Sequence, residues 1–207
     1  MNILVYGDSM SWGIIPGSRQ RQVFSKRWPG VMKLSLGDDC HLIEECLNGR
    51  TTAYEDPNRP NRHGIDHVQM VLESNSPIDL FILMLGVNDF QDCIGATALE
   101  SAANLGRLIE KIRSITPEPM TAPPPILCVI QPEIQQAKGP MAEKFSGGAE
   151  RGKGSEQAYK SVLSQLDVPY FLASDHIGLS KVDGVHLDEE EHKILGEKLA
   201  KHIKQSY

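Results

Sequence analysis

The feature that most constrains the fold is the alternation of short apolar segments with longer amphipathic segments. The short segments cover residues 2–6, 41–47, 79–85, 125–130 and 168–173. The first, third and fourth of them are apolar without a break, which is typical of strands that are buried on both faces. We therefore expect a sheet of five strands with its centre shielded from water.

The longer segments between the strands carry apolar residues at helical spacing. They predict helices at about residues 24–36, 63–74, 97–114, 154–166 and 189–204. Strands that alternate with helices form a parallel sheet that is covered on both sides. The predicted fold class is therefore α/β, with three α/β/α layers around a five-stranded parallel sheet. The remaining segment 133–154 is polar, glycine-rich and long, which favours a functional or mobile loop.

Composition limits the organisation and the partners of the chain. The 207 residues, of which 40% are hydrophobic, suit one core, so we predict a single domain over residues 1–207. The formal charge of −6 and the lack of a Lys/Arg run argue against nucleic acid as a partner. No apolar stretch approaches the ~20 residues that a membrane span needs. Four cysteines without C-x-x-C spacing, and a start that does not resemble a signal peptide, favour a cytoplasmic protein.

Polar residues follow the predicted strands at one edge of the sheet. The first strand leads into GDS at 7–9, the second into NGR at 48–50 and the third into GVND at 86–89. Open parallel sheets bind ligands beyond the carboxyl ends of their strands. Directly before the last helix stands DGVH at 183–186, which supplies a carboxylate and an imidazole three residues apart. These four blocks predict the place of the chemistry.

The residue types in these blocks suit acyl transfer. A serine hydroxyl such as that of Ser9 needs a base, for which His186 is the candidate, and Asp183 could hold the imidazole in the correct tautomer. A tetrahedral oxyanion needs donors that are already in place. The candidates are the Ser9 backbone N–H, the Gly49 backbone N–H and the Asn88 side-chain amide.

The four blocks, in this order, resemble the SGNH hydrolases, also called the GDSL esterase/lipase family. GDSMSWG, RWPG, LNGRTT, LMLGVND and DGVHLDEEEHKILG look like its small bacterial arylesterase/acyltransferase branch. The resemblance implies Ser9 as nucleophile, Gly49 and Asn88 as oxyanion donors, and Asp183 with His186 as the other triad members. It further implies a flavodoxin-like sheet and a serine esterase for esters of short acyl chains. Members of that branch often transfer the acyl group to alcohols or peroxide, and often form homo-oligomers.

Three positions depart from the pattern of that branch, and none removes a predicted catalytic group. Met10 stands where leucine is usual, Val87 where threonine is common, and Ile14 where another tryptophan is frequent. These departures concern the shape of the acyl pocket. They therefore bear on the preference between water and an alcohol as acyl acceptor.

Aromatic and apolar residues near the blocks are candidates for the walls of a substrate site. Trp12 lies three residues past the predicted nucleophile, so its ring could flank the acyl group. Tyr54, Phe90 and Ile134 are further wall candidates, and Asp8 adjoins the nucleophile. We expect these five residues to contribute to substrate binding.

Two alternative sites need to be weighed against the serine site. His192 could join His186 as a zinc ligand, but H-E-x-x-H spacing is absent and a solvated helix face explains His192 better, so we expect no metal and no organic cofactor. GGAERGKG at 147–154 approaches a phosphate-binding loop and predicts, as a rival, a nucleotide-binding module. It ends in Gly154 rather than the Ser/Thr that would hold Mg²⁺, and no buried strand precedes it. Carbohydrate-ester deacetylase, thioesterase and lysophospholipase remain open as variants of the esterase.

Overall fold

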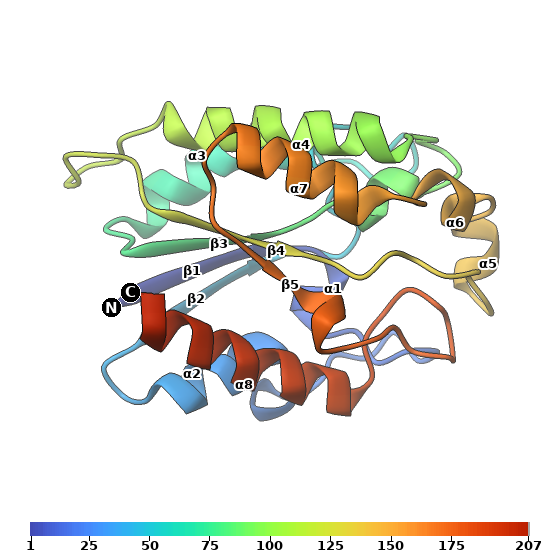
Figure 1. Cartoon of the computed structure of the whole chain (residues 1–207), viewed down its shortest axis with the longest axis horizontal. Coiled ribbons are helices and arrows are strands. Elements are labelled where there is room, and N and C mark those ends of the chain that lie inside the picture. Colours follow the sequence, from blue (N-terminus) through green and yellow to red (C-terminus); the bar gives the residue numbers. More distant parts are fainter. Residues whose placement is uncertain (207) are drawn as a thin grey trace.

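The computed structural model describes residues 1–206 as a parallel sheet between two layers of helices (Figure 1). The strands are β1 (Asn2–Gly7), β2 (His41–Cys46), β3 (Leu80–Met84), β4 (Ile126–Ile130) and β5 (Tyr170–Leu172). They form one five-stranded sheet in the order β2-β1-β3-β4-β5, and every neighbouring pair is parallel. This order is that of flavodoxin-like folds, so the predicted fold class and strand content are confirmed.

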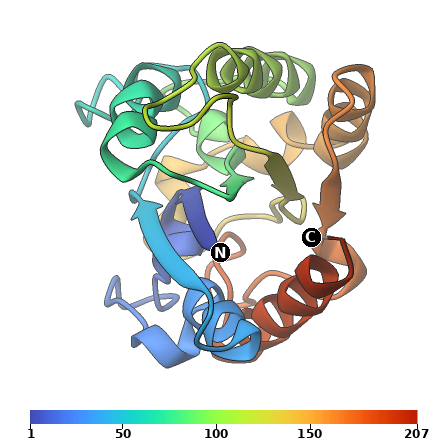
Figure 2. The same ribbon diagram turned by 90° about the vertical axis from the view of Figure 1, so that its left-hand side faces the viewer.

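The long helices lie close to their predicted ranges. Helices α2 (Trp28–Leu36) and α8 (Glu189–Ser206) cover one face of the sheet (Figures 1 and 2). Helices α3 (Gly64–Asn75), α4 (Ala98–Arg113) and α7 (Ser155–Gln165) cover the other. The predicted helix at 24–36 is divided into a 3₁₀ turn, η1 (Phe24–Lys26), and α2. The division falls at Arg27, which is extended, because Pro29 occupies a first-turn position of α2 and favours a helix start there.

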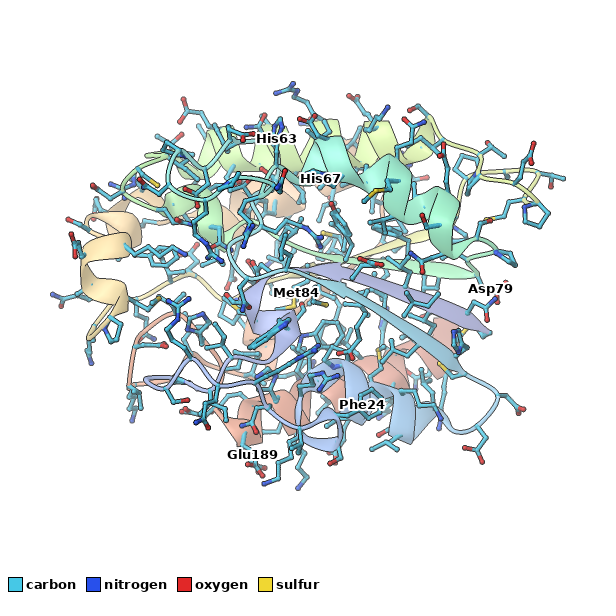
Figure 3. All side chains as sticks on the ribbon, turned by 180° about the vertical axis from the view of Figure 1, so that it is seen from behind. Phe24, His63, His67, Asp79, Met84 and Glu189 are labelled. Atoms are coloured by element: carbon cyan, nitrogen blue, oxygen red, sulfur yellow. The ribbon has the colours of Figure 1, made fainter. Side chains whose placement is uncertain are left out.

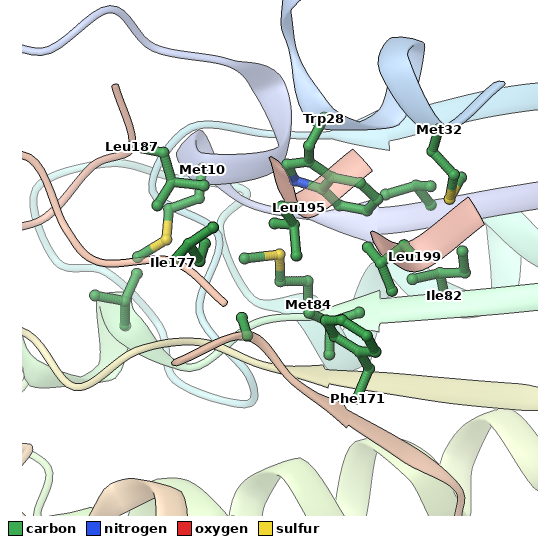
Figure 4. Close-up of a cluster of buried hydrophobic side chains, with 14 of the residues drawn as sticks. Met10, Trp28, Met32, Ile82, Met84, Phe171, Ile177, Leu187, Leu195 and Leu199 are labelled. Carbon is green, nitrogen blue, oxygen red and sulfur yellow. The ribbon is translucent and has the colours of Figure 1, made fainter. Parts of the chain in front are cut away.

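The sheet has an apolar core on each face. The core under α2 and α8 contains Trp28, Met84 and Leu195, all completely buried (Figure 4). The opposite core contains Leu83 and Leu108, which join β3 to α4. In Figure 3, Met84 lies in the middle layer, with the labelled histidines of the α3 region on one side and Phe24 and Glu189 on the other. Strands β3 and β4 are buried at every position, as their uninterrupted apolar runs predict.

The segment 133–154 folds against the last loop of the chain. It contains two short helices, α5 (Met141–Lys144) and α6 (Gly148–Arg151), which the sequence did not predict. The backbone N–H of Lys138 donates to the carbonyl of Asp183 at 3.0 Å, and that of Gln135 donates to the carbonyl of Gly184 at 3.2 Å. These bonds fix the segment beside the DGVH block.

The nucleotide-binding alternative does not agree with this arrangement. A phosphate-binding loop connects a buried strand to a helix. The element before Gly147 is α5, and the helix after it, α6, has only four residues.

No helix within residues 1–206 is long and apolar enough to cross a membrane.

His192 lies in the interior and not on a solvated helix face, so that expectation was wrong. It is 0% exposed, and its Nδ1 accepts a hydrogen bond from the Trp28 backbone N–H at 3.3 Å. Helix α8 turns this position toward α2, which packs closely against it. Burial, with smaller contributions from the charges of His186 and Arg27, lowers the pKa of His192 from 6.5 to about 4.

This burial predicts a pH-dependent contribution of His192 to stability. The folded state disfavours the charged imidazole, so the unfolded chain binds more protons and stability is lost as pH falls from 6.5 toward 4. The lowered pKa corresponds to a contribution of about 3 kcal/mol to the free energy of unfolding. Between about pH 7 and about pH 4, the free energy of unfolding measured with urea should fall by about 3 kcal/mol more in the wild type than in His192→Gln. An equal loss in both proteins would contradict the assignment.

Candidate active site

The site lies where the strand order reverses. The chain leaves β1 for β2 on one side and continues to β3 on the other, so the exits of β1 and β3 flank one crevice. Ser9 is the first residue of the short helix α1 (Ser9–Trp12), directly after β1. The turn into α1 requires a glycine, because a Cβ atom at Gly7 would lie 2.3 Å from Ser11 Oγ. Asn88 lies in the 3₁₀ turn η2 (Val87–Phe90) that follows β3.

The structure brings Ser9, His186 and Asp183 together in one hydrogen-bonded chain. His186 Nε2 lies 3.0 Å from Ser9 Oγ, and His186 Nδ1 lies 2.7 Å from Asp183 Oδ2. The three residues are 5%, 4% and 2% exposed, respectively, so bulk water has little access to either bond. This is the geometry that a serine nucleophile, its base and the orienting carboxylate require.

Asp183 is held by its own backbone as well as by the imidazole. Its Oδ1 accepts the backbone N–H groups of Val185 and His186 at 3.0 and 2.9 Å. Burial alone would raise the pKa of Asp183, but the hydrogen bonds from the ring and backbone of His186, its charge, and the Val185 amide together lower it. The carboxylate is therefore ionised at neutral pH, and it can accept a hydrogen bond from a protonated Nδ1 of His186.

The three predicted oxyanion donors lie around the same position. Ser9, Gly49 and Asn88 all line the cavity that also contains Asp183 and His186. Among the hydrogen bonds between described residues, the backbone amides of Ser9 and Gly49 donate none. Gly49 has φ +85°, the left-handed conformation that glycine adopts without strain. Both amides are therefore without a hydrogen-bond acceptor within residues 1–206.

Asn88 is placed by contacts with two neighbouring segments and with the end of its own turn. Its Nδ2 donates to the Arg50 carbonyl at 3.1 Å and to Asp8 Oδ2 at 3.3 Å, and its Oδ1 accepts from Gln91 Nε2 at 2.8 Å. The contact with Asp8 is the longest of the three.

Asp8 holds together the strand ends next to the site. It caps α1 by accepting the Met10 backbone N–H at 2.9 Å, and its second oxygen accepts Gln131 Nε2 at 3.1 Å. Gln131 in turn accepts the backbone N–H of Val87 at 3.0 Å. Burial raises the pKa of Asp8, and these hydrogen bonds partly oppose that rise. Asp8 therefore joins the ends of β1, β3 and β4, and it does not line the cavity.

The cavity beside Ser9 is small and mostly apolar on one side. Its volume is about 30 Å³. Ile14, Met141 and Phe145 provide the apolar lining. Met141 and Phe145 belong to the segment 133–154, so this segment forms part of the rim of the cavity.

The other predicted wall residues lie outside the lining of this cavity. Trp12, Tyr54, Phe90 and Ile134 are not among the residues that line the cavity at Ser9. The Arg21 guanidinium lies 4.9 Å above the Trp12 ring, outside the site. Phe90 and Ile134 are buried in the core below α6, where a Cβ on Gly148 would contact Ile134. Tyr54 lies on the loop after β2, where Thr51 Oγ1 donates to its carbonyl.

Sequence reasoning also missed the cationic residues of the cavity. Arg19, Arg59 and Lys144 line it, and each comes from a different loop or short helix. No motif contains them, because their proximity depends on the folding of three separate connections. The spacing of Met141 and Phe145, four residues apart, was the one available signal for an apolar face in this segment.

The comparisons with known proteins identify one family and several similar structures. The model of the GDSL-like lipase/acylhydrolase family matches residues 5–194. A carbohydrate acetylesterase from Sinorhizobium meliloti is similar in structure, with a TM-score of 0.94, 33% identity, and coverage of 100% of this chain and 99% of that one. An aryl esterase from M. smegmatis is similar at a TM-score of 0.93 and 31% identity, with the same coverage. A protein described as a putative arylesterase from Agrobacterium tumefaciens has a TM-score of 0.89 and 31% identity, again with 100% and 99% coverage. Among the curated proteins, none matches the chain.

Proposed function

The chain belongs to the GDSL-like lipase/acylhydrolase family, and we propose that it hydrolyses short-chain carboxylic esters through an acyl intermediate on Ser9. The family and the esterases among the similar structures make it a carboxylic ester hydrolase. The observation that carries the mechanism is the buried chain of hydrogen bonds from Ser9 through His186 to Asp183. It ends at a cavity that also contains two free backbone amides.

The first step forms the acyl-serine. Ser9 Oγ attacks the ester carbonyl while His186 Nε2, 3.0 Å away, takes its proton. Asp183 keeps the proton of the ring on Nδ1, so that Nε2 presents its lone pair to the hydroxyl. The charge that develops on the ring is stabilised by the ionised carboxylate. The alcohol then leaves with the proton from His186.

The carbonyl oxygen becomes negative in the tetrahedral intermediate. The backbone N–H groups of Ser9 and Gly49 and the Nδ2 of Asn88 are its donors in this proposal. Each such donor contributes roughly 10²–10³ to kcat when it is already in place. Water then attacks the acyl-serine by the same route, with His186 again acting as the base.

The size of the cavity favours a short acyl group. A volume of about 30 Å³ beside Ser9 leaves little room beyond an acetyl group, and Ile14, Met141 and Phe145 close its apolar side. Forcing extra methylenes into a packed pocket costs typically ~1–3 kcal/mol. The similar structures include a carbohydrate acetylesterase and arylesterases, which fits a small acyl group with a variable alcohol.

A series of 4-nitrophenyl esters tests the proposal. We expect kcat/KM to fall roughly 10-fold or more between the acetyl and the hexanoyl ester, because the longer chain does not fit the cavity. Rapid mixing with the acetate should release a burst of 4-nitrophenol that matches the enzyme concentration whenever deacylation is the slower step. A kcat/KM that rises with chain length would contradict the short-acyl proposal. No Ser9-dependent turnover of any ester would contradict the function itself.

A further inference from the structure

Three cations lie together at the cavity without carboxylate partners. Arg19, Arg59 and Lys144 line it, and no ion pair between described residues includes any of them. The one carboxylate in the lining is Asp183, which is already bonded to His186. The chain as a whole carries a net charge of −6, so this concentration of positive charge is local to the site.

Two observations place these cations close to the predicted chemistry and to one another. A Cβ atom built on Gly49 would lie 2.7 Å from Arg59 Nη1, so the guanidinium rests against the proposed oxyanion donor. Burial, and next the charge of Arg59, lowers the pKa of Lys144 to about 8, with Asp56 and Asp8 acting in the opposite direction. The mutual repulsion and the lost hydration of these groups are costs that a bound anion would offset.

The cations are placed where they can contact the alcohol portion of a bound ester. A second cavity, of about 370 Å³, shares Arg19, Arg59, Pro140 and Lys144 with the small cavity at Ser9. The cations therefore lie at the boundary between the small cavity at Ser9 and a wider one. Asp56, Asp92 and Glu143 also line the wider cavity, so the part of its lining that attracts an anion is the boundary where Arg19, Arg59 and Lys144 lie.

We propose that the preferred substrates are short-chain esters of an alcohol that carries an anionic group, a carboxylate or a phosphate, which Arg19, Arg59 and Lys144 bind beside Ser9. This inference rests on the proposed esterase function and names its substrate class. Guanidinium and ammonium groups bind such oxyanions through charge-assisted hydrogen bonds. The bond that forms and breaks is unchanged, and the released alcohol retains its anionic group.

The test uses two esters of equal size. 3-Acetoxybenzoate carries a carboxylate, and 3-acetoxybenzamide is its neutral counterpart with the same acyl group. Dividing kcat/KM for the first by that for the second gives a charge preference. Comparing this preference between variants cancels the intrinsic reactivity of the two esters. 3-Acetoxyphenyl phosphate is the third substrate, and it separates a carboxylate site from a phosphate site.

We expect the preference to fall at least ~10-fold from wild type to the double variant Arg59→Met Lys144→Met, which keeps most of both aliphatic stems. Lys144→Arg should retain it, and Lys153→Met, which removes an exposed cation outside the cavity, should leave it at the wild-type value. The wild-type preference should also decline as salt is added. A charge preference that is the same in wild type and double variant would overturn the proposal.

The outcome can be separated from a failure of the esterase function. Ser9-dependent turnover of 3-acetoxybenzamide without a charge preference would leave the esterase in place and remove the anion site. If neither ester is turned over, the esterase function fails, and titration calorimetry decides the anion site. Wild type should then bind 3-hydroxybenzoate at least ~10-fold more tightly than 3-hydroxybenzamide, and the double variant should not. Equal binding of the two phenols by the wild type would overturn the inference.

Discussion

Ser9→Ala should lower kcat for 4-nitrophenyl acetate by roughly 10⁴–10⁶ and abolish covalent labelling by an organophosphonate. The proposed reaction passes through a bond between Ser9 Oγ and the acyl carbon, and the alanine variant has no atom that can form it. His186 would retain its bond to Asp183 through Nδ1, but its Nε2 would have no hydroxyl to deprotonate. The remaining rate would come from the oxyanion donors and from binding alone.

Ser11→Ala provides a matched control for this variant. Ser11 lies in the same short helix, is 0% exposed, and its Oγ has no hydrogen-bond partner among the described residues. Removing that hydroxyl should leave kcat and labelling close to wild type. Mass spectrometry after labelling should place the phosphonate on Ser9 in wild type and in Ser11→Ala. Labelling that persists in Ser9→Ala, or that occurs at another residue, would show that Ser9 is not the nucleophile.

The arrangement of the sheet could be predicted from the sequence because the same residues that favour a buried strand locally also mark where that strand ends in the sheet. β1 and β3 are continuous apolar runs that end in glycine and polar residues, so both the strand and its exit are visible in the sequence. Parallel strands must have their carboxyl ends at one edge, which brings Ser9 and Asn88 to the same crevice. The DGVH block could be added because its residue types complete a known chemical set.

The walls of the cavity could not be predicted in the same way. Ile14, Arg59 and Met141 come from three connections whose paths depend on contacts formed only in the folded protein. Proximity in sequence does not set proximity in the fold: Trp12 lies near Ser9 along the chain, yet it has Arg21 over its ring and does not line the cavity. His192 was misplaced for a related reason, because the acidic first turn of α8 suggests solvent while the opposite face of that turn packs on α2.

Asp183→Asn should lower kcat by up to about 10⁴ with little change in KM. The substitution separates the two tasks of this side chain. Asp183 Oδ1 accepts the Val185 and His186 backbone amides, and an asparagine oxygen can accept the same two bonds. Asp183 Oδ2 faces His186 Nδ1 at 2.7 Å, where asparagine would present an NH₂ group. The loop would therefore retain its shape, while the ring would lose its acceptor.

The consequence for the imidazole follows from the hydrogen-bond directions. An NH₂ group at that place donates to Nδ1, so the ring proton must move to Nε2 and point at Ser9 Oγ. In that tautomer Nε2 has no lone pair for the serine proton, and no carboxylate balances a charge on the ring. Asp175→Asn, the same change at an exposed position outside the cavity, should leave kcat unchanged.

Asp183→Ala distinguishes control of the tautomer from control of the fold. Alanine removes both backbone acceptor bonds as well as the ring acceptor, so its Tm should fall below that of Asp183→Asn while its loss of kcat is of similar size. Activity that follows Tm across wild type, Asn and Ala would mean that Asp183 only supports the loop. Equal, large losses of kcat at unequal Tm would place its contribution on the imidazole, because the one property that both variants lack is the negative acceptor at Nδ1.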